Sequence, residues 1–323
     1  MAKHRSVLFT GSGSKKLPEP MLCDQLPNDS ELLWIDISGK NALSEGKAMS
    51  ARYAVPAGLL PDGRHGTSPD FGRLGDWTAI RAVAAHVGPG LRFFGQVLLI
   101  LAGKNIVITI HEEEIAGIEA LIETSCQREA IGHLGHGSFL ASILDWHLWT
   151  YFQAAAAFEI EIERLENAVL DRKAPEEGFI PALQRLRRAA SRLRRMLAPH
   201  RVIFLSLSRP DFAPDGQTLE ARHYQALDAR FASAMDTVEN ARELVMGSFQ
   251  LFSSQTDLQT NQVMRFLTFV TVVTGVFAVI AGVLGMNFEE DFFKSSSGFW
   301  IALGGMAFVA VLAYVIGRRG KWF

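Results

Sequence analysis

Two apolar runs near the C-terminal end dominate the hydrophobic pattern of this chain. The first, residues 266–284, contains no charged side chain, and the second, residues 299–316, follows after a polar loop. At 1.5 Å per residue the first run forms a helix of about 28 Å, close to the hydrocarbon thickness of a bilayer. Trp300 and Tyr314 stand near the ends of the second run, as aromatic side chains do at membrane interfaces. The pattern predicts two transmembrane helices.

A second pattern runs through the first apolar helix, where small or polar side chains recur at steps of three and four, the repeat of a coiled-coil seam. These residues are Asn261, Met264, Thr268, Thr271, Gly275, Ala278, Gly282 and Gly285. Such a stripe allows close packing between membrane helices. It also suits a water-lined pore that several copies of the same helix enclose.

The end of this helix favours the pore. A glycine at position 285 lets the helix end with its last carbonyl groups free to face an ion. The carboxamide of Asn287 offers a neutral oxygen to the water shell of a cation. Because Mg²⁺ gives up its water reluctantly, contact through that shell is a plausible way to select it.

Gly285, Met286, Asn287 and Phe288 resemble the signature of the CorA family of divalent-cation channels and transporters, and residues 261–268 resemble the beginning of its pore helix. The resemblance implies a CorA-like funnel, a homopentamer with five copies of this helix around one pore. It implies that Gly285, Met286 and Asn287 form an outer ring that binds the hydrated ion. It also implies a hydrophobic gate at Met264 and Leu267, so that Leu267 joins the stripe as a pore-lining residue.

Charged residues flank the two apolar helices unequally. The connecting loop carries the acids Glu289, Glu290 and Asp291. The tail carries the bases Arg318, Arg319 and Lys321. By the positive-inside rule the tail is cytoplasmic and the loop lies outside, so both termini are cytoplasmic. Repeated acidic loops raise the cation concentration at a pore mouth, although an ordinary solvated loop has the same composition.

The absence of proline predicts a long helix before the membrane. All 12 prolines lie at or before Pro214, and a helix interior tolerates proline badly. We therefore expect one continuous helix from about residue 219 to 284, about 100 Å long, which connects a cytoplasmic part to the pore. Asp228 and Asp236 on this helix are candidates for binding a regulatory ion.

The first 137 residues predict a mixed α/β domain. Residues 32–37 read as a strand, and the runs 91–101 and 105–110 predict a hairpin. Acids at 112–114 open a helix whose isoleucines share one face. Residues 1–30 indicate no element, and for residues 78–87 helix and strand stay open.

From residue 138 the pattern is helical. An acidic helix over 139–170 precedes a helix that begins near Pro175 and carries Arg185, Arg187, Arg188, Arg192, Arg194 and Arg195. We expect an antiparallel hairpin with complementary charges. Without aromatic residues between the arginines, nucleic acid is a poor candidate partner.

Composition supports a membrane protein without catalytic chemistry. The 323 residues are 48% hydrophobic and 20% charged, with a net charge of −2 that gives no sign of nucleic-acid binding. The two cysteines, Cys23 and Cys126, form no disulfide framework, which suits a reducing cytoplasm. The N-terminus has no signal-peptide core. No catalytic triad, phosphate loop or zinc motif is indicated, so we expect no enzyme and no resident cofactor.

The identity of the ion stays open between Mg²⁺ and Zn²⁺, with Co²⁺ and Ni²⁺ as further candidates. The chain has no His or Cys after His223 and no acid in the apolar helices, which favours hard, hydrated ions such as Mg²⁺. Residues 194–201 and the ending 321–323, however, resemble the ZntB zinc-transporter branch of the same superfamily. Gly275 and Ala278 also stand where magnesium channels carry a bulky methionine and a threonine.

The predicted protein is thus a pentameric divalent-cation transporter of the inner membrane. Its partners are copies of itself, the lipid bilayer and divalent metal ions. The expected organisation is a cytoplasmic α/β domain over 1–137, a helical region over 138–260, a pore helix over 261–287, an extracytoplasmic loop over 288–298, a second transmembrane helix over 299–317 and a basic tail over 318–323. The alternative is a two-helix membrane receptor or binding module without ion flux.

Overall fold

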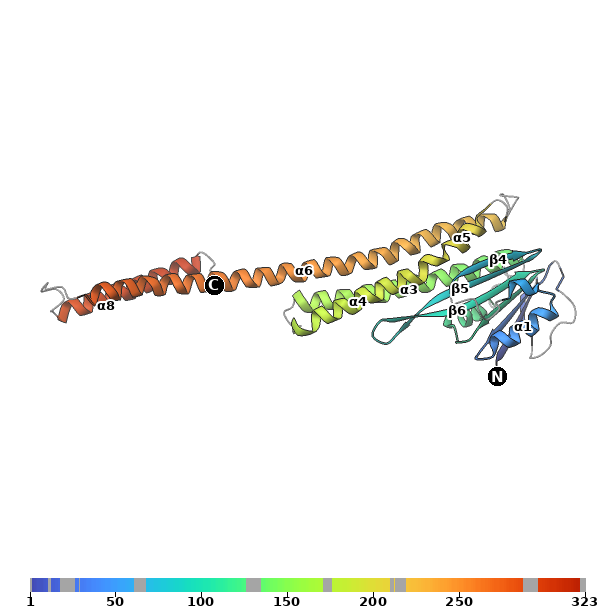
Figure 1. Cartoon of the computed structure of the whole chain (residues 1–323), viewed down its shortest axis with the longest axis horizontal. Coiled ribbons are helices and arrows are strands. Elements are labelled where there is room, and N and C mark those ends of the chain that lie inside the picture. Colours follow the sequence, from blue (N-terminus) through green and yellow to red (C-terminus); the bar gives the residue numbers. More distant parts are fainter. Residues whose placement is uncertain are drawn as a thin grey trace. The chain divides into compact units, whose positions relative to one another are not determined.

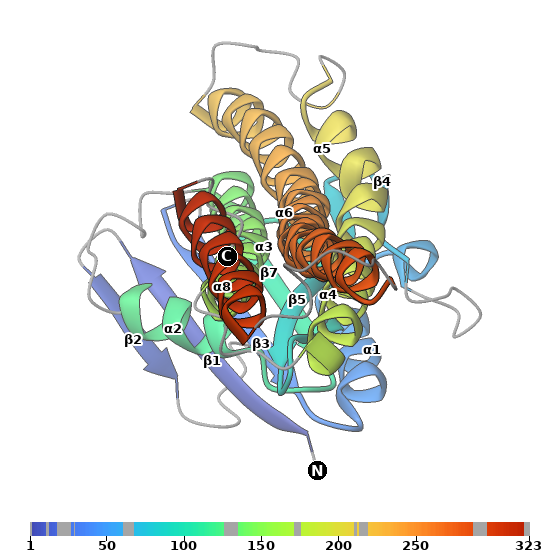
Figure 2. The same ribbon diagram turned by 90° about the vertical axis from the view of Figure 1, so that its left-hand side faces the viewer.

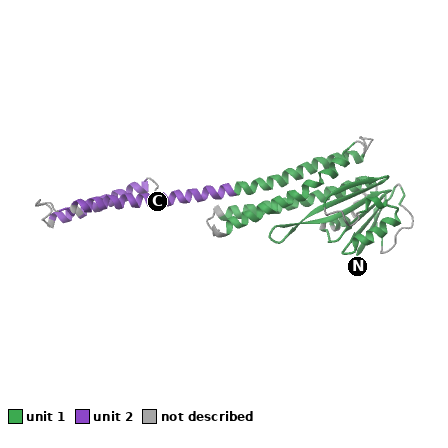
Figure 3. Ribbon diagram, in the orientation of Figure 1, with its two compact units in different colours: residues 1–248 green, residues 249–323 purple. Residues whose placement is uncertain are grey.

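The structure, a computed structural model, describes residues 2–10, 13–17, 27–28, 30–60, 68–125, 135–170, 176–209, 212, 219–286 and 296–319. The chain forms two compact units, residues 1–248 and residues 249–323 (Figure 3). One helix, α6 (Leu219–Leu284), runs from the first unit into the second. Its bounds agree with the helix expected from the distribution of proline.

A mixed sheet forms the centre of the first unit (Figure 1). Its strands, in spatial order, are β2 (Gly13–Leu17), β1 (Lys3–Thr10), β3 (Leu32–Ser38), β7 (Ile106–His111), β6 (Arg92–Gly103), β5 (Trp77–Gly88) and β4 (Asp70–Leu74). β3 and β7 are parallel, and all other described neighbours are antiparallel. The strand at 32–37 and the hairpin of β6 and β7 confirm the sequence-based predictions.

Both faces of the sheet are covered, which explains why its central strands are apolar throughout. Ile35 and Ile108 belong to a core cluster on the face that α1 (Ala42–Arg52) covers. On the opposite face, the ring of Trp34 lies 5.2 Å from that of Phe139 on α3 (His136–Leu170). All seven residues of β3 are buried. Such a strand shows no alternation in its sequence.

Parts of the sheet were not foreseen, β4 at its far edge among them. The N-terminal residues, which indicated no element, form β1 and β2 at one edge, and only Val7 and Phe9 of β1 are buried. Residues 78–87 belong to β5. Their alanine-rich sequence fits a helix or a strand. They form a strand because they pair with β6 along the length of β5.

Beyond Arg81, side chains take the place of a neighbouring strand along the outer edge of β5. Asp70, at the start of β4, pairs with Arg81, and the outward-facing groups of the later β5 residues need other partners. The backbone N–H of Val83 donates to His200, and that of Ala85 donates to Thr150 on α3. The histidine and threonine therefore close an otherwise open edge.

The remaining helices of the first unit pack beside the sheet. They are α2 (Ala116–Ser125), α4 (Glu176–Leu197) and α5 (Arg201–Leu207), together with the 3₁₀ segments Ala57–Leu59 and Ala198–His200. On α6, buried side chains recur at steps of three and four, as on a helix that packs along one face. They are Ala221, Tyr224, Leu227, Phe231, Ala234, Val238, Ala241 and Val245.

The expected hairpin of α3 and α4 is present, but its charges pair differently from the expectation. Glu161 on α3 bonds chiefly to Arg164 of the same helix, 2.6 Å away, and Arg185 of α4 adds only a weaker attraction that helps to lower the pKa of Glu161. Arg194 of α4 instead binds Glu239 of α6 at 2.7 Å. Among the described residues, the ion pair of the arginine-rich helix therefore leads to the long helix.

Candidate functional site

The second unit contains the two helices that the apolar runs predict. They are the end of α6 and α8 (Ser296–Arg319), whose most apolar stretches have mean hydropathies of 2.4 and 2.3. Both are long and apolar enough, by length and composition, to cross a membrane. None of the described side chains in those stretches is buried within the chain, so their apolar surface is left for lipid or for other copies.

The stripe of small and polar residues lies on this exposed part of α6. The described members that have large side chains, Met264 and Leu267, are each 57% exposed. A Cβ atom added at Gly275 or Gly282 would meet no atom within 4 Å. Packing inside one chain thus does not require glycine at either position. Whatever favours small residues there must come from outside the single chain.

Two threonines of the stripe bond back to their own helix. The hydroxyl of Thr268 donates to the carbonyl oxygen of Met264, and that of Thr271 donates to Leu267, each at 2.8 Å. Because these bonds use the hydroxyl hydrogens, the threonine oxygens keep lone pairs that can accept from water. A helix face of this kind presents acceptors to the hydration shell of a cation.

The end of α6 differs in one respect from the expectation that its last carbonyls stay free. The N–H of Gly285 donates to Ala281 at 2.9 Å, and the N–H of Met286 donates to Val283 at 3.2 Å. The helix therefore tightens into a final turn, which occupies two of these carbonyl groups. Gly285 does so without a left-handed backbone.

The structure describes only some of the sequence-predicted site residues. Gly285 and Met286 are exposed at the end of α6, and Arg318 and Arg319 are exposed at the end of α8, where basic charge suits the helix dipole. The other predicted residues of the ring, the acidic loop and the tail lie outside the described residues. They are Asn287, Glu289, Glu290, Asp291 and Lys321.

The candidate regulatory acids lie in the first unit. Asp228 and Asp236 both line a groove of about 410 Å³ between α5 and α6, together with Arg194 and Arg201. Over the described parts of the chain, no group of three or more His, Cys, Asp or Glu residues is arranged to hold a metal ion. The groove thus combines acids with bases.

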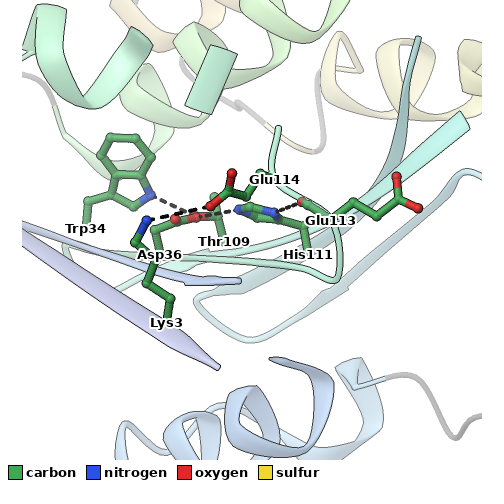
Figure 4. A network of polar contacts seen from close by, with 7 residues as sticks. All are labelled: Lys3, Trp34, Asp36, Thr109, His111, Glu113 and Glu114. Carbon is green, nitrogen blue, oxygen red and sulfur yellow. Dashed lines mark hydrogen bonds and ion pairs between the residues drawn. The ribbon is translucent and has the colours of Figure 1, made fainter. Parts of the chain in front are cut away.

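A buried polar network that the sequence did not reveal lies under α3 (Figure 4). The carboxylate of Asp36 on β3 accepts from the hydroxyl of Thr109 at 2.6 Å and from Nε2 of His111 at 3.0 Å, both on β7. Trp34 donates to the same hydroxyl at 3.0 Å. Nδ1 of His111 donates to the carbonyl of Glu113. The network joins the parallel strands and fixes the turn that leads into α2.

The charge on His111 follows from its partners. Burial alone lowers its pKa, but the hydrogen bond to Asp36, the attraction of that carboxylate and the bond to Glu113 outweigh it, so the pKa is raised above its usual value. Both ring nitrogens act as donors, which fits a protonated ring. An aspartate within a strand that is otherwise apolar was the only signal of this network in the sequence.

Comparisons with known proteins agree with this arrangement. Residues 29–319 match the family described as CorA-like Mg²⁺ transporter protein. The chain is 29% identical to the cobalt/magnesium transport protein CorA of Thermotoga maritima over 229 residues, which are 70% of this chain and 64% of that protein. The matched part thus spans less than two thirds of the length of that relative.

Two solved structures share the fold. The complete CorA magnesium transporter of Methanocaldococcus jannaschii has a TM-score of 0.70 at 22% identity, over 98% of each chain. The ZntB cytoplasmic domain of Vibrio parahaemolyticus has a TM-score of 0.54 at 15% identity, over 78% of this chain and 97% of that one. The two likenesses indicated by the sequence are thus present in the fold. Since the family match covers most of the sequence, the chain belongs to the CorA-like Mg²⁺ transporter family.

Proposed function

We propose that five copies of this chain form a pore that carries divalent metal cations across a membrane, with α6 of each copy facing the axis. The observation that carries the proposal is the stripe on α6. Its small and hydroxyl-bearing side chains are exposed, and neither Gly275 nor Gly282 is explained by a contact inside the chain. Several such helices around an axis enclose a passage lined by acceptors and small groups.

The cargo is a hydrated ion. The apolar part of α6 contains no acid, histidine or cysteine, so it offers no ligands for a stripped metal ion. Neutral oxygens of threonine, and of the Asn287 carboxamide beyond the helix end, contact the water shell instead. Mg²⁺ suits such a passage well, and Zn²⁺, Co²⁺ and Ni²⁺ remain rival substrates.

The narrow parts of the passage fall at its two ends. Met264 and Leu267 form a hydrophobic constriction on the cytoplasmic side, where an apolar ring can close by excluding water. Gly285, Met286 and Asn287 form the outer ring, and the acidic loop residues gather cations in front of it. The basic residues at the end of α8 and beyond it favour a cytoplasmic location for both termini, and the membrane of this proposal is the inner membrane.

Uptake into liposomes tests this function. Purified full-length chain is reconstituted, and the entry of Mg²⁺, Zn²⁺, Co²⁺ and Ni²⁺ is followed separately with ion-sensitive dyes. We expect flux of at least one ion and its loss in Asn287→Ala, with the oligomer intact. Asn240→Ala, which alters an exposed asparagine on the first-unit part of α6, is the matched control and should keep the flux.

Two results would contradict the proposal. Absence of flux for every ion, in an intact oligomer, would favour a membrane receptor or a binding module. Normal flux in Asn287→Ala would leave a transporter but remove the asparagine ring as its ion site.

A further inference from the structure

One side of α3 carries a row of apolar side chains in solvent. Trp149 and Ile160 are 44% and 69% exposed, and Ala156 is exposed between them on the same side of the helix. Glu163 continues the row one turn further and is exposed as well. We call these four residues the α3 ridge. Single exposed apolar residues are ordinary, but an aligned row marks an interaction surface.

A second surface, on α4 and α5, has the complementary character. Val202 and Leu205 on α5 are 49% and 46% exposed. Arg188 and Arg195 on α4 point away from the buried side of that helix. Neither arginine has an ion-pair partner among the residues that the structure describes. We call these four residues the α4–α5 face. It contains apolar side chains and bases, whereas the α3 ridge contains apolar side chains and an acid.

The groove described above opens beside this face. Its apolar wall consists of Leu205 of α5 and Phe231, Ala232 and Met235 of α6, beside the acids and bases already named. Its volume of about 410 Å³ is large enough to admit a bulky apolar side chain. The α4–α5 face thus offers a recess, whereas the α3 ridge offers a projecting tryptophan.

The two surfaces lie on opposite flanks of α6. On one side, Arg230 binds Asp145 of α3 at 2.7 Å, and on the other side Glu239 binds Arg194 of α4 at 2.7 Å. Because two and a half helical turns separate Arg230 from Glu239, they project in opposite directions. The end view agrees, with α3 on one side of α6 and with α4 and α5 on the other (Figure 2).

The apolar parts of the two surfaces also lie at the same height along α6. Trp149 is one turn beyond Asp145, so it lies one turn beyond Arg230, level with Ala234. On the other flank, Phe204 stacks on Phe231 with ring centroids 4.8 Å apart, which places neighbouring Leu205 within roughly one to one and a half helical turns of that level.

The charged parts match in the same way. Glu163 lies just before Glu166, whose carboxylate accepts from the hydroxyl of Ser248 at 2.6 Å. α4 runs opposite to α6, and Arg194 of α4 pairs with Glu239. Arg188 precedes Arg194 by almost two turns, so it lies almost two turns beyond Glu239 along α6, close to the height of Glu163. In a ring of copies around an axis parallel to α6, Glu163 of one copy would therefore face Arg188 of the next when Trp149 faces the groove.

We propose that the α3 ridge of one copy docks against the α4–α5 face of the next copy, with Trp149 seated beside Leu205 and Glu163 beside Arg188. The contact is head-to-tail, so repeating it around an axis closes a ring. The inference rests on the proposed oligomeric pore and adds the surface that holds its first units together.

Cross-linking of the full-length protein in detergent tests the contact. Cys23 and Cys126 are first replaced by serine, and Trp149→Cys and Leu205→Cys are introduced singly and together. A short bismaleimide should give a ladder of covalent species beyond the dimer only in the double variant, because each contact uses one residue from either copy. The control pairs Trp149→Cys with Leu74→Cys, a position on β4 that is 52% exposed, and should give no ladder.

The possible results are distinct. An oligomer by light scattering without a ladder overturns this interface and leaves the proposed pore intact. Dimers from Trp149→Cys alone would show a symmetric α3–α3 contact and overturn the proposal as well. A protein that is monomeric at every concentration would contradict both the interface and the pore.

A charge exchange gives a second measurement that does not need cysteine. We expect Glu163→Arg to raise the protein concentration at half assembly by about tenfold, because a base would then face a base. Adding Arg188→Glu to it should restore assembly, since the pair is re-formed in reverse. Equal assembly in Glu163→Arg and the native chain would count against the proposed register.

Discussion

The Nε2 atom of His200 accepts a hydrogen bond from the backbone N–H of Val83 at 2.9 Å. An acceptor nitrogen cannot carry a proton, and the other ring nitrogen donates to the carbonyl of Leu197, so this buried ring is neutral. The ring centroid of His147 lies 4.5 Å from that of His200. Nε2 of His147 and the hydroxyl of Tyr151 both donate to the carbonyl oxygen of Val83. Two neutral histidines thus hold the open edge of β5.

These histidines predict that acid weakens the first unit. Burial lowers the pKa of His147 to about 4 and, with the neighbouring His147 ring, lowers that of His200 well below its usual value. The unfolded chain therefore takes up more protons as pH falls below about 6.5. The stability that neutral His147 contributes is complete above that pH and falls by about 3 kcal/mol by pH 4.

Hydrogen exchange locates this effect. After correction for the intrinsic rate, the Val83 amide should lose protection as the pH falls from 7 to 5. His147→Gln keeps a donor for the carbonyl of Val83 but does not titrate, so its protection should depend less steeply on pH. Equal pH dependence in both proteins would contradict the assignment.

His111 predicts the opposite dependence. Its pKa is raised in the folded chain, mainly by Asp36 against the effect of burial, so its contribution to stability is complete below the usual pKa and is lost as pH rises through the raised value. Asp36→Asn should lower the free energy of unfolding by about 2 kcal/mol at pH 6, where the charged bond is fully formed, and by less in alkali.

Titration of the His111 ring by NMR gives the direct measurement. Its midpoint should lie above the usual value for a histidine side chain in the native chain and should fall in Asp36→Asn. A midpoint that does not change in the variant would mean that the carboxylate does not hold the proton on the ring.

The parts of the fold with a strong local signal were predictable from sequence. The long helix followed from the absence of proline after Pro214, and the hairpin of β6 and β7 from two apolar runs joined by Gly103. In contrast, β1 contributes only two buried side chains, Val7 and Phe9, and its pairing with β3 comes from contacts distant in the sequence. Such a strand has too little hydrophobic pattern to be recognised alone.

The polar networks show the same limit. His147 and His200 are far apart in the sequence, and the edge of β5 that they close is open because β4 begins at Asp70, opposite Arg81. The stripe on α6 was visible from Thr271 and Gly275 because helical spacing is local. The surface of another copy that the stripe faces depends on how the copies assemble. The residues that determine the assembly lie on several helices that are distant in the sequence.

The hydroxyl of Thr271 gives a prediction about the pore. Thr271→Val keeps the shape of the side chain but removes the acceptor, so uptake of Mg²⁺ into liposomes should fall by about tenfold if that oxygen lowers the barrier by roughly 1.4 kcal/mol. Thr271→Ser, which keeps the hydroxyl, should retain most of the uptake. Thr256→Val removes a similar bond to the helix outside the apolar run and serves as the control. Full uptake in Thr271→Val would show that water does not line this position.

Gly275 tests whether the small face of α6 encloses the passage. A Cβ atom there meets no atom of another part of the chain within 4 Å, so Gly275→Met should fold normally and alter only what lies outside the single chain. If that space is the pore, several methionines would narrow it at one level, and uptake should fall by about tenfold or more, an effect of roughly 1.4 kcal/mol on the barrier. Gly304→Met on α8 is the matched control, because a Cβ atom there also meets nothing within 4 Å from another part of the chain and the position is outside the proposed lining. Equal flux in both variants would place Gly275 against lipid or a neighbouring helix, and the stripe would then be a packing face.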